Sequence, residues 1–450
     1  MIRVTQRSCW FVASALVASL PGPASPQSVQ WTKNAIVIDG NTAQSALTSV
    51  SADGHVLVFN TSDVRITGLT AGQVLVLQDL GARRVLGTVR QGPVTAVATN
   101  AAALTDFIQE GAIQFPNKSK DPSILDQQDT TSSIPGVDHL SGLVGDWEYE
   151  AKAETADSGP NDIKYSFKAS KHISGLDAVI NGKGMLTDSG FSFMADIHGA
   201  KLQKLYFTAP IEGSLKVDWA VETKGTNSGI GERRLRLPSF FKEIFVANHI
   251  PFLYEINANL IFIPGLGGKH DAVSGGFEVT YSGHGGFAAT DKDSSPVKEM
   301  KASANSVDKV TTSALAAHGV VLAMNAPKIA LSFGTTSFME AVHSSKPAVL
   351  KNGVADRYEA QLANVLTKDS EELFRTEGGA YVQWVNEYDY AGSGPMSIVP
   401  NCATTHLNLI ASGGFDAKLL GIPGKGSFDL FHSESSKTEP DIGGCRVDKK

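Results

Sequence analysis

The amino-acid sequence predicts a mainly β protein, in which a small β-rich domain with one helix is followed by a large antiparallel β-sandwich-like region. Three observations lead to this fold class. Apolar and polar residues alternate with period two through most of the chain, as in strands with one buried face. Charged residues make up only 19% of the sequence and glycine occurs 44 times, which suits strands joined by many turns. The length of 450 residues exceeds what one core usually holds, so two or three domains are expected.

The first 24 residues have the composition of a cleavable secretory signal, and residues 1–24 are predicted to be a signal peptide. Arg3 and Arg7 precede an apolar segment, and the small residues Gly22 and Ala24 place the expected cleavage after Ala24. The apolar segment is too short to span a bilayer, and no later segment has about 20 uninterrupted apolar residues. These features favour a secreted, periplasmic or cell-surface protein.

Two cysteines remain once such a signal, which contains Cys9, is removed. Cys402 and Cys445 form an even pair in a chain predicted to reach an oxidising compartment, where paired cysteines are usually oxidised. We therefore expect a disulfide between them. It would tie the C-terminal tail to a strand and stabilise the fold by about 3–4 kcal/mol.

Residues 29–116 are expected to form the small β-rich domain. Short runs of β-branched residues are separated there by Gly, Asp and Asn. The period then changes over residues 101–110, where Asn100 can cap a helix and Gly111 can end it. The apolar residues that would share the buried face of this terminal helix are Leu104, Phe107 and Ile108.

A linker and a long antiparallel region are predicted to follow. Residues 117–142 are polar and lack a sustained period, which is typical of a linker. Residues 143–450 are expected to form one β-sandwich assembly, or two that pack together. The charged segment 291–313 is expected to be an irregular loop and to mark the seam between them. Residues 355–374 fit a helix through apolar residues four apart, although their flanks also fit a strand pair.

The clearest alternation lies between residues 145 and 224. In its first strand the residues expected on the buried face are Trp147, Tyr149, Ala151 and Ala153. Those expected on the exposed face are Glu148, Glu150, Lys152 and Glu154. This pattern is typical of antiparallel strands that cover a core on one side.

The charge of the chain argues against nucleic acid as a partner, because a net charge of −7 repels phosphate backbones. A local basic run is the exception, and it comprises Arg233, Arg234, Arg236 and Lys242. This run leaves peripheral contact with an anionic membrane surface open. The plainer interpretation is a solvated strand edge guarded by charge.

The sequence contains neither the Gly-x-Ser-x-Gly elbow of serine hydrolases nor the His-Glu-x-x-His motif of zinc proteases. Its glycine-rich stretches do not link a strand to a helix, as a dinucleotide site requires. We therefore predict no cofactor and no metal site.

Two carboxylates on one predicted strand, Glu387 and Asp389, are the candidates for acid–base catalysis. Their spacing places them on one strand face, and the nearby Trp384 could stack on a sugar ring. Such groups would serve glycoside cleavage if they faced a partner across a groove. Glu148 and Glu150 have the same spacing. In both pairs the spacing is also typical of a solvated strand face.

Apolar side chains concentrate at residues 240–263. Phe252, Tyr254 and Phe262, together with Trp384, are the candidate ligand-binding residues. The plainer interpretation is that this segment fills the core of a long β-sandwich. The alternative is that it lines a cavity for an apolar ligand or presents a patch to a membrane or a protein.

These observations favour an exported protein without catalysis, which binds a ligand or another surface. An apolar or lipid ligand is slightly favoured over a glycan, and a protein ligand stays open. One alternative is an extracellular polymer hydrolase that uses the paired carboxylates. The other is a structural component of a cell-envelope assembly, docked through the small domain.

Overall fold

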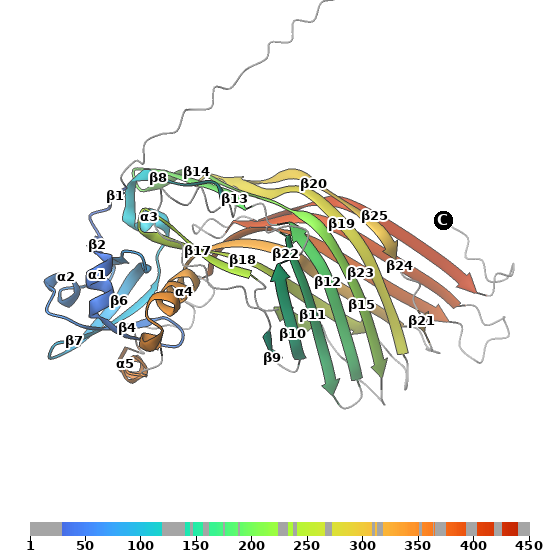
Figure 1. Cartoon of the computed structure of the whole chain (residues 1–450), viewed down its shortest axis with the longest axis horizontal. Coiled ribbons are helices and arrows are strands. Elements are labelled where there is room, and N and C mark those ends of the chain that lie inside the picture. Colours follow the sequence, from blue (N-terminus) through green and yellow to red (C-terminus); the bar gives the residue numbers. More distant parts are fainter. Residues whose placement is uncertain are drawn as a thin grey trace, which may run out of the picture.

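The computed structural model confirms the mainly β fold class. The residues that it describes are 29–118, 140–144, 147–155, 162–173, 176–187, 190–223, 233–236, 241–265, 272–307, 311–312, 318–350, 353–362, 364, 375–392, 403–417 and 425–439. Within them the strands form three sheets of twelve, seven and six strands. The two larger sheets are antiparallel and curled and form two layers, while the smallest sheet lies at one end of them (Figure 1).

The twelve-stranded sheet has a long antiparallel pairing at its centre. Its strands are β1 (Gln30–Trp31), β8 (Ile108–Lys118), β9 (Leu140–Val144), β10 (Trp147–Thr155), β11 (Asp162–Ile173), β12 (Leu176–Thr187), β13 (Phe191–His198), β14 (Lys201–Pro210), β15 (Glu212–Thr223), β19 (Ala272–Ala289), β20 (Ser294–Val307) and β21 (Thr311–Thr312). A single residue separates β14 from β15, and both pair with β19 in one continuous register. This register runs from Leu205 opposite Ala289 to Glu222 opposite Ala272.

The seven-stranded sheet forms the second layer. Its strands are β16 (Arg233–Arg236), β17 (Phe241–Ala247), β18 (Ile250–Gly265), β22 (His318–Gly334), β23 (Arg375–Gly392), β24 (Ala403–Ala417) and β25 (Lys425–Glu439). The two layers contact each other where β20 lies against β24 and β25 and where β19 lies against β23 and β24, and Figure 1 shows β20 and β25 side by side.

The expectation of an irregular loop at 291–313 is wrong for most of that segment. Ser294–Val307 is the strand β20, which pairs with β19 along nearly its whole length. Its composition is small and polar, so the sequence carries little strand signal there. Backbone hydrogen bonds to β19 stabilise the extended conformation instead. Most of the segment predicted as a seam is therefore a paired strand, β20, which lies where the two layers contact each other.

Alternation divides the strands of the twelve-stranded sheet into a buried and an exposed face, as the sequence predicts. In β10, Trp147, Ala151 and Ala153 are buried while Glu148 and Glu150 are exposed. The buried residues face the other layer and belong to one continuous core. The opposite face of this sheet is polar, and it is called the outer face below.

Glycines inside strands make room for aromatic rings of the neighbouring strand. The register partners are Gly142 with Tyr149, Gly182 with Phe167, Gly184 with Tyr165, Gly275 with Trp219, and Gly413 with Phe428. A Cβ atom on any of these glycines would lie between 2.1 and 2.9 Å from the nearest side-chain atom of its partner. The ring therefore covers the backbone next to it, and a larger side chain would collide with it.

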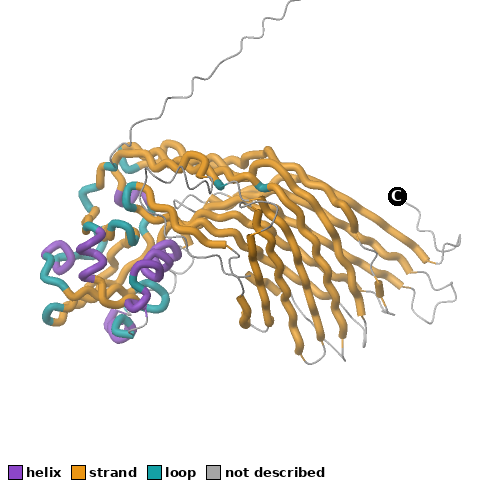
Figure 2. The backbone as a smooth tube through the Cα atoms, in the orientation of Figure 1, coloured by secondary structure: helices purple, strands orange, loops and turns teal. Residues whose placement is uncertain are grey.

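The smallest sheet has the strand order β2–β5–β6–β7–β4–β3, in which β2 and β5 are parallel. Its strands are β2 (Ala35–Ile38), β3 (Leu47–Val50), β4 (Val56–Asn60), β5 (Val74–Leu77), β6 (Gly81–Gln91) and β7 (Val94–Ala101). The helical elements are α1 (Gly40–Ala46), α2 (Val64–Thr67), α3 (Leu104–Phe107), α4 (Thr335–Ser345), the 3₁₀ helix η2 (Pro347–Leu350) and α5 (Asp356–Leu362). Figure 2 shows the helices gathered around this sheet.

The segment between β22 and β23 crosses over to the smallest sheet and covers it. Phe338 and Val342 of α4 join the core that contains Leu57 and Leu75. Tyr358 of α5 packs together with Leu362 of the same helix and Ala355 just before it, and these three side chains form a second core with residues of β4 and β7. The cores at this end are therefore completed by residues that lie more than 200 positions further along the chain.

The helix expected over 101–110 is only one turn long. α3 ends at Phe107, and β8 then continues as a strand of the twelve-stranded sheet, with Phe115 opposite Phe193. The three residues assigned to the helical face are all fully buried, as expected. After Ile108, alternation of Ile113 and Phe115 into the core together with pairing to β13 favours the strand. In the segment 355–374, α5 forms the described helix.

Several predictions concern residues outside the described part of the chain. They are the signal peptide at 1–24, the linker residues 119–139, the helix residues 365–374, and the disulfide partners Cys402 and Cys445.

Candidate functional site

Phe252 and Tyr254, two of the predicted ligand-binding residues, lie in the core between the layers. Phe252 is 0% exposed and Tyr254 is 2% exposed. The ring of Phe252 lies 5.4 Å from that of Phe115 and 5.5 Å from that of Phe333, and Tyr254 stacks on Phe191 at 4.9 Å. Rings at these distances contact one another directly. The two side chains therefore pack the layers together at the end near the smallest sheet.

The other predicted site residues are described through their backbone only. Phe262 pairs with Leu322, Trp384 with Met324 and Ala411, Glu387 with Val321 and Asn408, and Asp389 with Gly319 and His406. Their side chains fall outside the described structure. Acid–base catalysis by Glu387 and Asp389 stays a prediction.

Three hollows in the described surface lie on the outer face of the twelve-stranded sheet. The first has a volume of about 420 Å³ and lies over β9, β10 and β11. The side chains that point into it from the outer face are Ser141, Leu143, Glu148, Glu150, Lys168 and Ser170. Glu148 and Glu150 sit side by side on β10 and are both exposed, so they do not face each other across a cleft.

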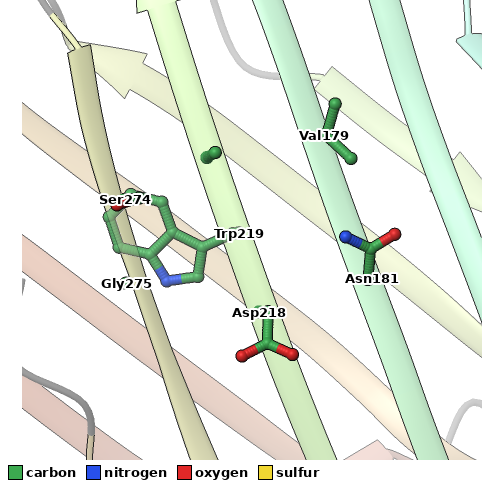
Figure 3. A pocket seen from close by; sticks show the side chains of 7 residues that line it. Val179, Asn181, Asp218, Trp219, Ser274 and Gly275 are labelled. Carbon is green, nitrogen blue, oxygen red and sulfur yellow. The ribbon is translucent and has the colours of Figure 1, made fainter.

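The second hollow, of about 360 Å³, lies over β12, β15 and β19. Figure 3 shows Val179 and Asn181 on one strand, Asp218 on the next, and Ser274 with Gly275 on the third. Alternation along the strands directs the side chains of Asn181, Asp218 and Ser274 outward. Trp219, next to Asp218, is 3% exposed and belongs to the core.

The third hollow, also about 360 Å³, lies at the opposite end of β12, β15 and β19 and reaches β20. Its polar lining includes Thr187, Glu212, Ser214, Thr280, Lys301 and Ser303. The hydroxyls of Thr280 and Ser303 lie 3.0 Å apart on paired strands. The hollow thus presents hydroxyls between one acidic and one basic side chain.

Hydroxyl, amide and carboxylate groups line the three hollows together with two lysines. Such groups both donate and accept hydrogen bonds, so they suit a polar ligand. Among the residues that the structure describes, no group of three or more His, Cys, Asp or Glu could hold a metal ion. None of the described helices is both long enough and apolar enough to cross a membrane.

Sequence analysis alone did not single out Asn181, Asp218 or Ser274. Each occupies a polar position in an alternating strand, and every strand of this sheet has such positions. Their proximity depends on the pairing of β12, β15 and β19, which brings together residues far apart in the sequence. Alternation could have placed them on the exposed face but could not have brought them together.

A charged cluster at the β13–β14 turn leads to a testable prediction about the pKa of His198. The Nδ1 atom of His198 lies 2.8 Å from Glu110 Oε2, and its Nε2 atom lies 3.2 Å from Asp196 Oδ1. The hydrogen bond to Glu110 and the charge of Asp196 raise the pKa of His198 above its ordinary value of 6.5. A hydrogen bond from the Gly199 amide, and then His198 itself, lowers the pKa of Glu110.

Because the pKa of His198 is higher in the folded protein, its contribution to stability is present below pH 6.5 and is lost as the pH rises through the folded pKa. An NMR titration of selectively labelled histidine should show His198 titrating above its ordinary pKa. Glu110→Gln should move that titration back down. A midpoint for His198 at or below 6.5 in the unmodified chain would contradict this prediction.

Comparison with known proteins bears on the N-terminal part of the chain. The family model described as a domain of unknown function, DUF8403, matches residues 20–110. This range contains the whole of the smallest sheet. No curated protein and no solved structure matches the chain.

Proposed function

We propose that the protein is an exported binding protein without catalysis, which engages a polar ligand through the outer face of its twelve-stranded sheet. The observation that carries this proposal is the position of the three hollows, which all lie on this polar face. A ligand bound there would meet hydrogen-bonding side chains along a broad, open surface. Export rests on the N-terminal sequence alone.

A polar ligand is favoured over the lipid that the sequence slightly favours, because of where the apolar side chains lie. Phe252 and Tyr254 are packed among other rings, so they contribute to the core. The hollows instead expose hydroxyls, carboxylates and an amide. Binding of an apolar molecule there would bury these groups without hydrogen-bond partners, at a cost of about 1–3 kcal/mol for each group.

The test is a binding screen of the full chain against glycans, peptides and lipid vesicles, with a variant that blocks all three hollows. This variant carries Ser141→Arg, Ala220→Arg and Ser303→Arg, three substitutions at exposed positions. A ligand of the native chain should bind the variant at least about tenfold more weakly, because each arginine fills its hollow.

The matched control adds the same charge elsewhere. Ala52→Arg, Ser62→Arg and Thr70→Arg are three exposed positions around the smallest sheet, and together they should leave binding unchanged. Equal affinity of the blocked variant and the native chain, or binding to lipid vesicles alone, would overturn the proposed function.

A further inference from the structure

The first two hollows adjoin each other across the strand pair β11–β12. Ser170 of the first hollow is the register partner of Val179 in the second, and Lys168 is the partner of Asn181. Register partners in an antiparallel pair project from the same face and lie next to each other. No strand separates the two hollows on this face, and the band of outward-facing positions that joins them is called the trough below.

Two rows of outward-facing positions follow this trough across six adjacent strands, β9, β10, β11, β12, β15 and β19. The first row is Leu143, Glu148, Ser170, Val179, Ala220 and Ser274. The second row is Ser141, Glu150, Lys168, Asn181, Asp218 and Gly276. Six strands spaced about 4.8 Å apart give the trough a length of roughly 24 Å. A ligand that fills it must be elongated and must run across the strands.

The charges along the trough narrow the chemistry of that ligand. Glu148, Glu150 and Asp218 carry negative charge, and Lys168 is the one cation in the two rows. A polyanion would be repelled by this balance. The uncharged middle of the trough consists of Ser170, Val179, Asn181 and Ala220. These small apolar groups beside hydroxyl and amide groups suit a neutral chain that has both hydroxyls and C–H faces.

Given the proposed function, on which this inference rests, we propose that the trough binds a linear, neutral polysaccharide lying across the strands. One β-1,4-linked sugar unit is close in length to the spacing between strands, so successive sugars would lie over successive strands. Each sugar makes few contacts in so open a trough. Affinity should therefore accumulate along the chain, with each unit held near its own strand once its neighbour is bound.

The experiment is a calorimetric titration of the full chain with β-1,4-linked glucan, xylan, mannan and chitin oligosaccharides, from disaccharides to hexasaccharides. For at least one series, affinity should rise by about tenfold or more between the disaccharide and the hexasaccharide. It should change little with salt, because the ligand is uncharged.

Variants within the trough test whether the first two hollows act as one binding site or as two independent sites. Ala220→Arg places a long side chain in the first row and should abolish the gain from disaccharide to hexasaccharide. Asn181→Ala should weaken hexasaccharide binding by about threefold to tenfold, as expected for lost hydrogen bonds. Thr70→Arg, at an exposed position beside the smallest sheet and outside all three hollows, is the matched control and should have no effect.

The outcomes distinguish this proposal from the function on which it rests. If hexasaccharides bind no more tightly than disaccharides, or if Thr70→Arg weakens binding as much as Ala220→Arg, the trough proposal is overturned. A second result would also overturn it: no neutral glycan binds, but another polar ligand binds the native chain and fails to bind the variant blocked in all three hollows. In that case the proposed function stands. If the blocked chain retains all binding, both proposals fail.

Discussion

Arg83→Ala is expected to lower the free energy of unfolding by about 3–5 kcal/mol. The Arg83 side chain is 0% exposed, and its guanidinium donates to the Gly54 carbonyl at 2.7 Å, the Thr335 hydroxyl at 2.5 Å and the Thr99 hydroxyl at 3.2 Å. Thr335 begins α4, so this one side chain joins the smallest sheet to the segment that covers it. Its removal would leave buried acceptors unsatisfied, at about 1–3 kcal/mol each, and would open a cavity.

Burial removes the charged guanidinium from water, which is unfavourable and therefore lowers the pKa of Arg83 to about 9. The group is still charged at neutral pH. Arg83→Met would remove that desolvation cost and keep the apolar stem, so it should destabilise less than Arg83→Ala. The lost hydrogen bonds and the lost packing can be separated by comparing the two variants.

Urea unfolding of the full chain measures both effects, and hydrogen exchange in α4 should report faster opening. Arg65→Ala is the matched control, since Arg65 is a partly exposed arginine of the same sheet region, ion-paired with Asp63 at 2.6 Å. Its loss should cost about 0–1 kcal/mol. If Arg83→Ala lowers the free energy of unfolding no more than Arg65→Ala does, the buried guanidinium does not join the smallest sheet to α4.

Gly182→Val is expected to destabilise the protein by about 3 kcal/mol. A Cβ atom at this position would lie 2.1 Å from Cζ of Phe167, its register partner on β11. Phe167 is 3% exposed and packed in the core between the layers, so its ring has little freedom to move aside. The valine would force the ring or the backbone out of place.

Lys183→Val tests the same strand and the same new side chain on the opposite face. Lys183 is exposed, so its replacement should change stability by less than about 0.5 kcal/mol. A double-mutant cycle of Gly182→Ala with Phe167→Ala should show strong coupling, because the smaller ring partner relieves the collision. Additive effects in thermal unfolding of the two single variants and the double variant would exclude the ring–glycine contact as the cause.

The same glycines show where sequence reasoning reaches its limit. A count of 44 glycines suggests many turns, yet Gly142, Gly182 and Gly275 lie inside strands beneath aromatic rings. Whether a glycine forms a turn or accommodates a ring depends on which residue lies opposite it. That residue belongs to another strand, and a single sequence does not specify the pairing.

The helix predicted at 101–110 is too long, and the loop predicted at 291–313 is wrong for most of its length, for a related reason. In both segments the local residue pattern carries no information about the strand that pairs with it, which is β13 in one case and β19 in the other. Pairing to an existing sheet satisfies the backbone donors and acceptors of a segment whose own composition is ambiguous. Tertiary context therefore selected the strand.

By itself, the sequence determined which side chains of each strand face the core and which face solvent, because side-chain direction alternates with every residue. This is why Trp147 and Glu148 could be assigned to opposite faces before any strand was paired. The tertiary structure alone decided which strands are neighbours. The trough depends on that decision, since it joins Ser141 to Gly276 through five strand pairings, and each pairing is set by contacts between residues distant in the chain.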